Sequence, residues 1–227
     1  MTRILLTLAL FISSTLLTKA QFKKNDILLG GQLSYNYNSS SYSYTGALPP
    51  TNEYKDKDGN ITISGGKATN ENTVLGIYLS YLPSSSTNYP SLNADIMLKY
   101  RNDGYGGGIF YRKYKNLGKE FYLFGEISAA YNWYNKSGKD SADQELISGS
   151  TSSFAAILYP GIAYRISKHL FLELSIPDLI YIGYSKSNTS SHEGSSIMEN
   201  KYTDFNITTS LSSDPLLGLG IGFRLIL

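Results

Sequence analysis

The chain has 227 residues, no cysteine and a formal net charge of +2. Without cysteine it has no disulfide framework and no thiol site. Such a balanced charge also gives no basic surplus for binding nucleic-acid phosphates. Tyrosine and glycine are abundant, at 20 and 21 residues, whereas tryptophan occurs once.

The first twenty residues have the pattern of a secretory signal peptide. Arg3 supplies the positive start, residues 4–17 are mostly apolar, and small residues precede the junction between Ala20 and Gln21. This order predicts cleavage at that junction. The apolar run is too short for a spanning helix, which needs about 20 apolar residues. We therefore expect a signal peptide over 1–20 and a mature domain over 21–227, whose 18 basic residues balance 18 acidic ones.

Beyond residue 20, apolar residues recur at every second position, not at helical spacing. This alternation is typical of β-strands with one apolar face. Eight alternating runs follow in chain order: 27–37, 74–82, 92–101, 105–114, 121–134, 154–165, 170–176 and 217–227. An even number of such runs predicts an all-β fold, an antiparallel up-and-down transmembrane barrel of eight strands.

The last run shows the alternation most clearly. One face carries glycines and Arg224, and the other is expected to face lipid through Leu217, Leu219, Ile221, Phe223, Leu225 and Leu227. Prolines at 177 and 215 are expected to interrupt the seventh and eighth runs, because proline removes a donor from the strand ladder.

The segments between the runs alternate in length. Residues 115–119 and 166–169 are short, whereas 39–72, 135–152 and 185–203 are long and polar. Short periplasmic turns and long outer loops are typical of outer-membrane barrels. The sequence therefore predicts three long loops at the cell surface.

The charged residues fall on the face opposite the apolar one. In hydrocarbon a closed sheet bonds all its backbone groups internally, and an interior of eight strands is filled by side chains. Charges inside it are buried and must pair, unless some face water at a lumen mouth. We expect a lumen network centred on Arg112, Glu126, Glu173 and Arg224. The inward positions as a set are Asp95, Lys99, Arg112, Glu126, Arg165, Glu173 and Arg224.

Four stretches carry a resemblance to a known family. They are Ile-Leu-Leu-Gly-Gly-Gln-Leu-Ser at 27–34, Ile-Phe-Tyr-Arg-Lys-Tyr at 109–114, Phe-Tyr-Leu-Phe-Gly-Glu at 121–126, and Tyr-Pro-Gly-Ile-Ala-Tyr-Arg-Ile-Ser-Lys-His-Leu at 159–170. In order and spacing they resemble the outer-membrane protein β-barrel domain common in Bacteroidetes. The resemblance implies an eight-stranded barrel in the outer membrane and no catalytic residue. One departure is the terminal residue, Leu227, where outer-membrane strands commonly end in an aromatic residue.

Motifs for chemistry are weak. Ser190, Ser191, His192 and Glu193 are consecutive in a serine-rich segment, whereas a hydrolase needs such groups on separate rigid elements. Asp56–Asn60 lacks the spaced ligands of a calcium loop. We expect no enzyme activity, cofactor or metal.

The leading functional hypothesis is a non-enzymatic outer-membrane barrel with a filled interior, whose surface loops serve adhesion, recognition or scaffolding. Its expected partners are outer-membrane lipid, the insertion machinery and an unidentified surface ligand. The alternatives are a small porin-like channel and, less favoured, a lipid-modifying enzyme. The structural alternative is a soluble β-sandwich.

Overall fold

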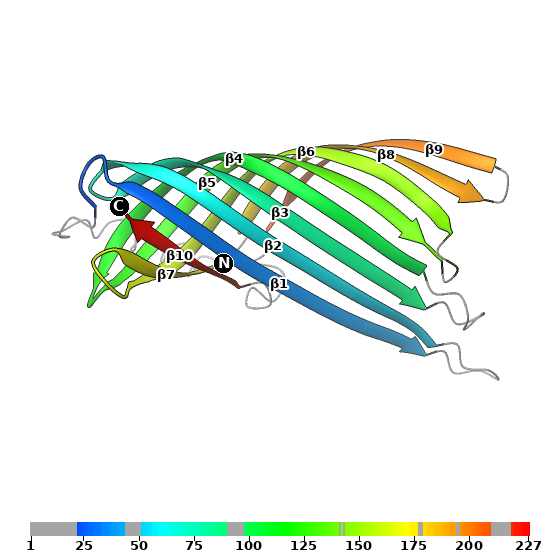
Figure 1. Ribbon diagram of the computed structural model, residues 1–227, viewed down its shortest axis with the longest axis horizontal. Coiled ribbons are helices and arrows are strands. Elements are labelled where there is room, and N and C mark those ends of the chain that lie inside the picture. The colour runs from blue at the N-terminus through cyan, green and yellow to red at the C-terminus, as the bar shows by residue number, and fades with distance from the viewer. Residues whose placement is uncertain are drawn as a thin grey trace, which may run out of the picture.

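A computed structural model describes residues 22–43, 51–89, 98–140, 142, 144–176, 179–193, 196–209 and 219–227. It is an antiparallel sheet of ten strands that curls on itself (Figure 1). The strands are β1 (Ile27–Ser43), β2 (Thr51–Asn70), β3 (Thr73–Tyr89), β4 (Leu98–Gly118), β5 (Phe121–Lys139), β6 (Glu145–Arg165), β7 (Leu170–Ser175), β8 (Ile180–Glu193), β9 (Ser196–Thr208) and β10 (Gly220–Ile226). No helix among the described residues is long and apolar enough to cross a membrane.

Eight of the ten strands close a ring. Each strand from β1 to β7 pairs with the next, β7 pairs with β10, and β10 pairs with β1. The closing ladder runs from Leu28 opposite Ile226 to Leu33 opposite Ile221. A closed ring leaves no exposed backbone edge, which is the condition for a sheet to cross hydrocarbon.

The strands β8 and β9 extend this ring without adding members to it. Along β6, residues 161–165 pair with β7 and residues 147–158 pair with β8, so β7 and β8 are two segments of one strand line. In the same way β9 pairs with β8, and β10, the next strand in the chain, pairs with β7. Pro177 and Pro215, which were expected to interrupt strands, lie outside the described residues.

Among the described residues, ring closure lies in the half of the barrel near the short turns. Pairing between β1 and β10 ends at Leu33, and from Ser34 onward the described part of β1 pairs with β2 alone. On the other side the described part of β9 pairs only with β8. Away from the short turns the strands therefore form a long curved wall, with β1 and β9 at its two edges (Figure 1).

The all-β antiparallel barrel is confirmed, but the prediction of three long surface loops is wrong. Most of 39–72 is the hairpin of β1 and β2, whose ladder runs unbroken from Ile27 to Ser43. Most of 185–203 is β8 and β9, and 135–152 contains the ends of β5 and β6. These strand halves carry polar residues on both faces, so they lack the alternation on which the prediction depended.

The third and fourth predicted strands are also wrong as separate elements. The runs 92–101 and 105–114 belong, over their described residues, to the single strand β4. Asn102, Asp103 and Gly104 form no turn, because ladders to β3 and β5 hold them from both sides. The ring does contain eight strand lines, but β2 is one of them, and the sequence pattern did not reveal it.

The two faces of the ring are chemically distinct. On β3, Leu75, Ile77 and Leu79 are exposed, whereas Val74 next to them is fully buried. The final strand follows the prediction at its described positions: Ile221, Phe223, Leu225 and Leu227 are exposed, Leu219 is half-exposed, and Gly220, Gly222 and Arg224 are buried. Leu217 lies outside the described residues.

Aromatic side chains end the exposed apolar band on the side of the wall. Tyr81, Tyr105 and Trp133 are cross-strand neighbours on β3, β4 and β5. A second row continues across the next strands and consists of Tyr131, Phe154, Tyr184 and Phe205. Aromatic residues gather at the membrane–water boundary of such barrels, and the tyrosines and Trp133 also have a polar group that can face water, so these rows mark one girdle.

The strands are longer than a membrane requires. On β4 the exposed apolar positions start at Tyr105 and end before Lys113, and a tilted spanning strand needs about 9–11 residues. Beyond the girdle β4 continues back to Leu98 with Arg101 exposed. The wall therefore projects into water beyond the membrane.

An arginine placed on the band should destabilise the barrel. Ile77→Arg is expected to lower the free energy of unfolding by about 2–4 kcal/mol, the usual range for a cation at the bilayer midplane. Asn135→Arg, which is exposed beyond the girdle on β5 with Asp103 and Ser150 as register partners, should leave the free energy unchanged. Urea unfolding in phosphocholine vesicles, followed by the fluorescence of Trp133, measures both. Equal losses would contradict the position of the band.

Candidate functional site

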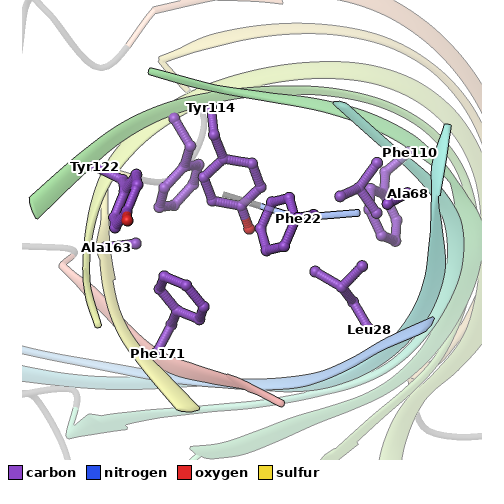
Figure 2. Packing of buried hydrophobic residues seen from close by; sticks show 10 residues of the cluster. Phe22, Leu28, Ala68, Phe110, Tyr114, Tyr122, Ala163 and Phe171 are labelled. Carbon is purple, nitrogen blue, oxygen red and sulfur yellow. The ribbon is translucent and has the colours of Figure 1, made fainter. Parts of the chain in front are cut away.

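The lumen near the short turns is closed by a plug of apolar side chains. Phe22, from the segment before β1, lies at the centre of the ring, and side chains from the surrounding strands point toward it (Figure 2). Its ring is 5.1 Å from that of Tyr114 and 5.9 Å from that of Phe171. The other members of the plug are Leu28, Ala68, Val74, Phe110, Tyr122, Phe124 and Ala163.

Backbone hydrogen bonds hold Phe22 in this position. Its N–H donates to the carbonyl of Glu71 at 3.2 Å, and Asn25 donates to Ala68 at 2.8 Å. Asn25 has a φ of 79°, a left-handed conformation that asparagine tolerates better than most residues. This turn directs the chain from inside the ring to the start of β1.

A layer of four charges lies next to the plug, with Glu173 at its centre. Arg112 Nη1 donates to both carboxylate oxygens of Glu173, at 2.8 and 2.7 Å. Arg224 donates from Nε at 2.9 Å and from Nη2 at 3.4 Å. One carboxylate thus holds two guanidinium groups that come from strands on different sides of the ring.

Glu126 completes this layer. Its Oε2 accepts from Arg112 Nε at 2.5 Å, and its Oε1 accepts from the hydroxyl of Tyr159. The Arg112 guanidinium also lies 4.3 Å from the centre of the Phe124 ring, a cation–π contact with the plug. All four charged residues are at most 6% exposed. Two arginines and two glutamates make the layer formally neutral.

The residues that were predicted to point into the lumen do not all lie together in the structure. It brings Arg112, Glu126, Glu173 and Arg224 together, as expected. Arg165 lies instead at the rim, where it forms an ion pair with Glu120 in the turn between β4 and β5. The hydrogen bond from Arg165 lowers the pKa of the Glu120 carboxyl, which is outside the membrane.

A further predicted residue, Lys99, does not join the network. The inward position of Lys99 is wrong: it is exposed on β4, which has the odd-numbered residues on its outer face. The shift of alternation follows from the absence of a turn at 102–104. Asp95 lies outside the described residues, as do Ala20 and Gln21 at the predicted cleavage junction.

Sequence reasoning missed three residues of the site. Tyr114 donates to Glu173 at 3.1 Å, and Tyr159 donates to Glu126. The alternation of apolar and polar residues puts Tyr114 and Tyr159 on the inward face, so this pattern could have identified both tyrosines as members of the site. Phe22 precedes the first run, and no periodic pattern could have placed it.

A polar well occupies the lumen on the other side of the charge layer. Its volume is about 180 Å³, room for several water molecules. Arg112, Glu173 and Arg224 contribute to its floor. Hydroxyl and amide side chains line its sides in the direction of the projecting strands. The lumen therefore has three layers: an apolar plug, a charge layer and an open polar well.

Comparisons with known proteins give likeness in shape only. No protein-family model matches the chain, and no curated protein matches it. Among solved structures, the outer membrane protein OprG from Pseudomonas aeruginosa is 14% identical, with a TM-score of 0.46 over 92% of this chain and 99% of that one. A major outer membrane protein from Thermus thermophilus is 12% identical, with a TM-score of 0.41 over 88% and 99%. The attachment invasion locus protein Ail of Yersinia pestis is also 12% identical, with a TM-score of 0.32 over 89% and 99%.

The molecule's own geometry determines its class. A closed ring of eight antiparallel strand lines carries an apolar outer band with an aromatic girdle and encloses a charged interior. That arrangement is inverted relative to a water-soluble β-sandwich and is the architecture of bacterial outer-membrane barrels. The chain is an integral outer-membrane β-barrel protein.

Removing the charge at the centre of the layer should destabilise the barrel strongly. Glu173→Gln keeps the volume but leaves two buried guanidinium groups short of a counter-charge, and losses of about 3–5 kcal/mol are typical in such cases. The matched variant Glu120→Gln breaks an exposed pair and is expected to show no measurable change. Urea midpoints in vesicles test this, and a wild-type midpoint for Glu173→Gln would show that the layer does not stabilise the fold.

Proposed function

We propose that this protein is a non-enzymatic outer-membrane barrel that does not conduct and that acts through the wall it projects from the membrane, by recognition at the cell surface. The observation that carries the proposal is that two layers obstruct the lumen, the apolar plug around Phe22 and the charge layer around Glu173. We call these two layers together the block. A channel would need a continuous aqueous path, and eight strands enclose little more space than their own side chains fill.

The block argues strongly against the porin-like alternative, because the plug is closely packed and the charge layer is hydrogen-bonded. An ion would have to separate Glu173 from two arginines and then pass the ring of Phe22. Breaking buried, hydrogen-bonded charge pairs costs several kcal/mol. Steady conduction through this interior is therefore not expected.

The projecting wall is the part of the protein suited to a surface partner. Its strands are joined by long ladders, so it presents a fixed surface of serine, threonine, asparagine and charged side chains. Just beyond the girdle, Asp103 accepts from the Tyr81 hydroxyl at 2.8 Å and forms an ion pair with Arg101 at 2.8 Å. Such a rigid polar surface gives up little conformational entropy when it binds a partner.

The four sequence stretches named above support placement within the Bacteroidetes-type group of small outer-membrane barrels. The non-enzymatic role is supported by the commitment of the buried carboxylates to arginines. His169 is exposed at the short-turn end, and its Nδ1 lies 3.2 Å from the carbonyl oxygen of Ile226. Its ring therefore contacts the backbone at the rim and is remote from the buried carboxylates.

Electrical recording tests the block. The wild-type protein, inserted into planar bilayers, is expected to give no steady open-channel current, because the lumen lacks an aqueous path. An established porin, recorded under the same conditions, controls for insertion. Stable, ohmic current steps from the wild-type protein would overturn the proposal in favour of the channel.

Cysteine labelling tests which end faces outward. The chain has no cysteine, so single substitutions give unambiguous signals. Asn135→Cys, exposed just beyond Trp133, should react with a membrane-impermeant maleimide on intact cells. Lys168→Cys, in the short turn between β6 and β7, should react only after the cells are permeabilised. The reverse pattern would place the wall in the periplasm.

A further inference from the structure

The outer face of the sheet is basic where the strands leave the membrane. Two neighbouring rows of register partners cross β1 to β5 beyond the girdle, and together they contain five cations and no carboxylate. The first row consists of Tyr37, Lys57, Ser85, Arg101 and Ser137, and the second of Ser39, Lys55, Thr87, Lys99 and Lys139. A surface with such a surplus of one charge attracts groups of the opposite charge.

Alternation along β2 explains why the positive charges gather on this face. Residues 55–58 read Lys-Asp-Lys-Asp, and successive side chains of a strand point to opposite faces. The ladder between β1 and β2 is unbroken, so Lys55 and Lys57 lie on the same face as the exposed Ile61 and Ile63. The two aspartates lie on the inner face. The stretch that lacks the spacing of a calcium loop thus separates opposite charges across the sheet.

Two contacts place the nearest cations at the membrane boundary. The hydroxyl of Tyr81, in the girdle, donates to Asp103 Oδ1 at 2.8 Å, and Arg101 Nη2 donates to the same oxygen at 3.1 Å. The Arg101 guanidinium therefore lies beside the hydroxyl of the girdle, and its side chain is 67% exposed. Lys57 is also exposed, and its register partner is the exposed aromatic residue Tyr37 on β1.

An open hollow of about 340 Å³ lies between these two cations. Ser85 is the register partner of both Lys57 and Arg101. Neighbouring strands are about 4.8 Å apart, so the Cα atoms of the two cations are about 10 Å apart, and both long side chains can reach one anion between them. Tyr35, Gly59 and Pro83 also line the hollow. Asp58 borders it, but the alternation puts its carboxylate on the inner face.

The positive charge of this hollow is only partly offset. Asp103 forms an ion pair with Arg101 at 2.8 Å and thereby fixes the position of that guanidinium. Lys57 and Lys99 form no ion pair with any residue that the structure describes. Two exposed ammonium groups and a fixed guanidinium therefore face the headgroup layer with a single carboxylate beside them.

We infer that this hollow binds the phosphate group of an anionic lipid in the leaflet on the side of the wall. Lys57 and Arg101 hold the phosphate from two sides, as ammonium and guanidinium groups do, and the Ser85 hydroxyl lies between them. The acyl chains of the lipid then run along the apolar band. A lipid is favoured over a soluble anion because the hollow lies at the girdle, where lipid headgroups are concentrated.

Native mass spectrometry of the folded barrel, released from detergent micelles, tests this inference. The micelles contain equal amounts of dioleoyl phosphatidate, which is anionic, and dioleoyl phosphatidylcholine, which has the same chains and no net charge. We expect the wild-type protein to retain phosphatidate in severalfold excess. Equal retention of the two lipids would overturn the inference. Displacement of phosphatidate by added inorganic phosphate would show a site for free anions, and it would overturn the assignment to lipid.

Matched lysine variants locate the binding. Lys57→Gln should lower the retained phosphatidate about fivefold, the effect of one cation near an anionic lipid surface, whereas Lys57→Arg should retain it. Lys136→Gln removes the same charge from the inner face of the wall, where Nζ lies 6.0 Å from the centre of the Tyr100 ring, and should bind as the wild type does. Heat-modifiable gel migration confirms that each variant is folded. Equal losses in Lys57→Gln and Lys136→Gln would reveal a response to net charge alone and contradict the site.

Discussion

Closure of the sheet by β1 and β10 is the constraint on which the rest of the structure depends. Hydrocarbon offers no hydrogen-bond partner to a backbone edge, so a spanning sheet must join its first strand to its last. The short ladder from Leu28 to Leu33 meets that need, and it falls on the half of the barrel that carries the apolar band. Once the ring is closed, alternation along each strand sends one set of side chains to the lipid and the other to the interior.

The interior then has to be filled without leaving a charge unpaired. Glu173 resolves this by binding two arginines from strands that are distant in sequence, and Glu126 binds the remaining side of Arg112. A buried ion network is weak evidence for stability against an apolar core, because its desolvation cost is large. In the register of this barrel, all four partners lie within hydrogen-bond distance. The plug around Phe22 keeps water from that layer on the short-turn side.

How far the sequence predicted this structure depends on what surrounds each strand. Within the membrane the environment differs on the two faces, so residues such as Ile221 and Arg224 alternate, and both the strand and the charge network could be predicted. Beyond the girdle both faces meet water, so the polar parts of β2 and β9 carry no period that distinguishes strand from loop. Inside the band β2 has only Ile61 and Ile63 on its outer face before Gly65, a pattern too short to reveal the strand. Lys99 was placed inward because a turn was expected at Asn102–Gly104, where neighbouring strands in fact continue the ladder. Phe22 acts through tertiary position alone, which no local pattern records.

Ring closure can be tested directly by a cross-link between the first and last strands. Leu29 and Leu225 are register partners on β1 and β10, and cross-strand partners lie about 4.5–5.5 Å apart at their Cα atoms, within reach of a disulfide. In a chain without native cysteine, the double variant Leu29→Cys, Leu225→Cys should form that bond under mild oxidation in outer-membrane vesicles. The offset pair Leu29→Cys, Ile221→Cys should not. Cross-linking of the offset pair, or failure of the aligned pair in a folded barrel, would contradict the closed ring.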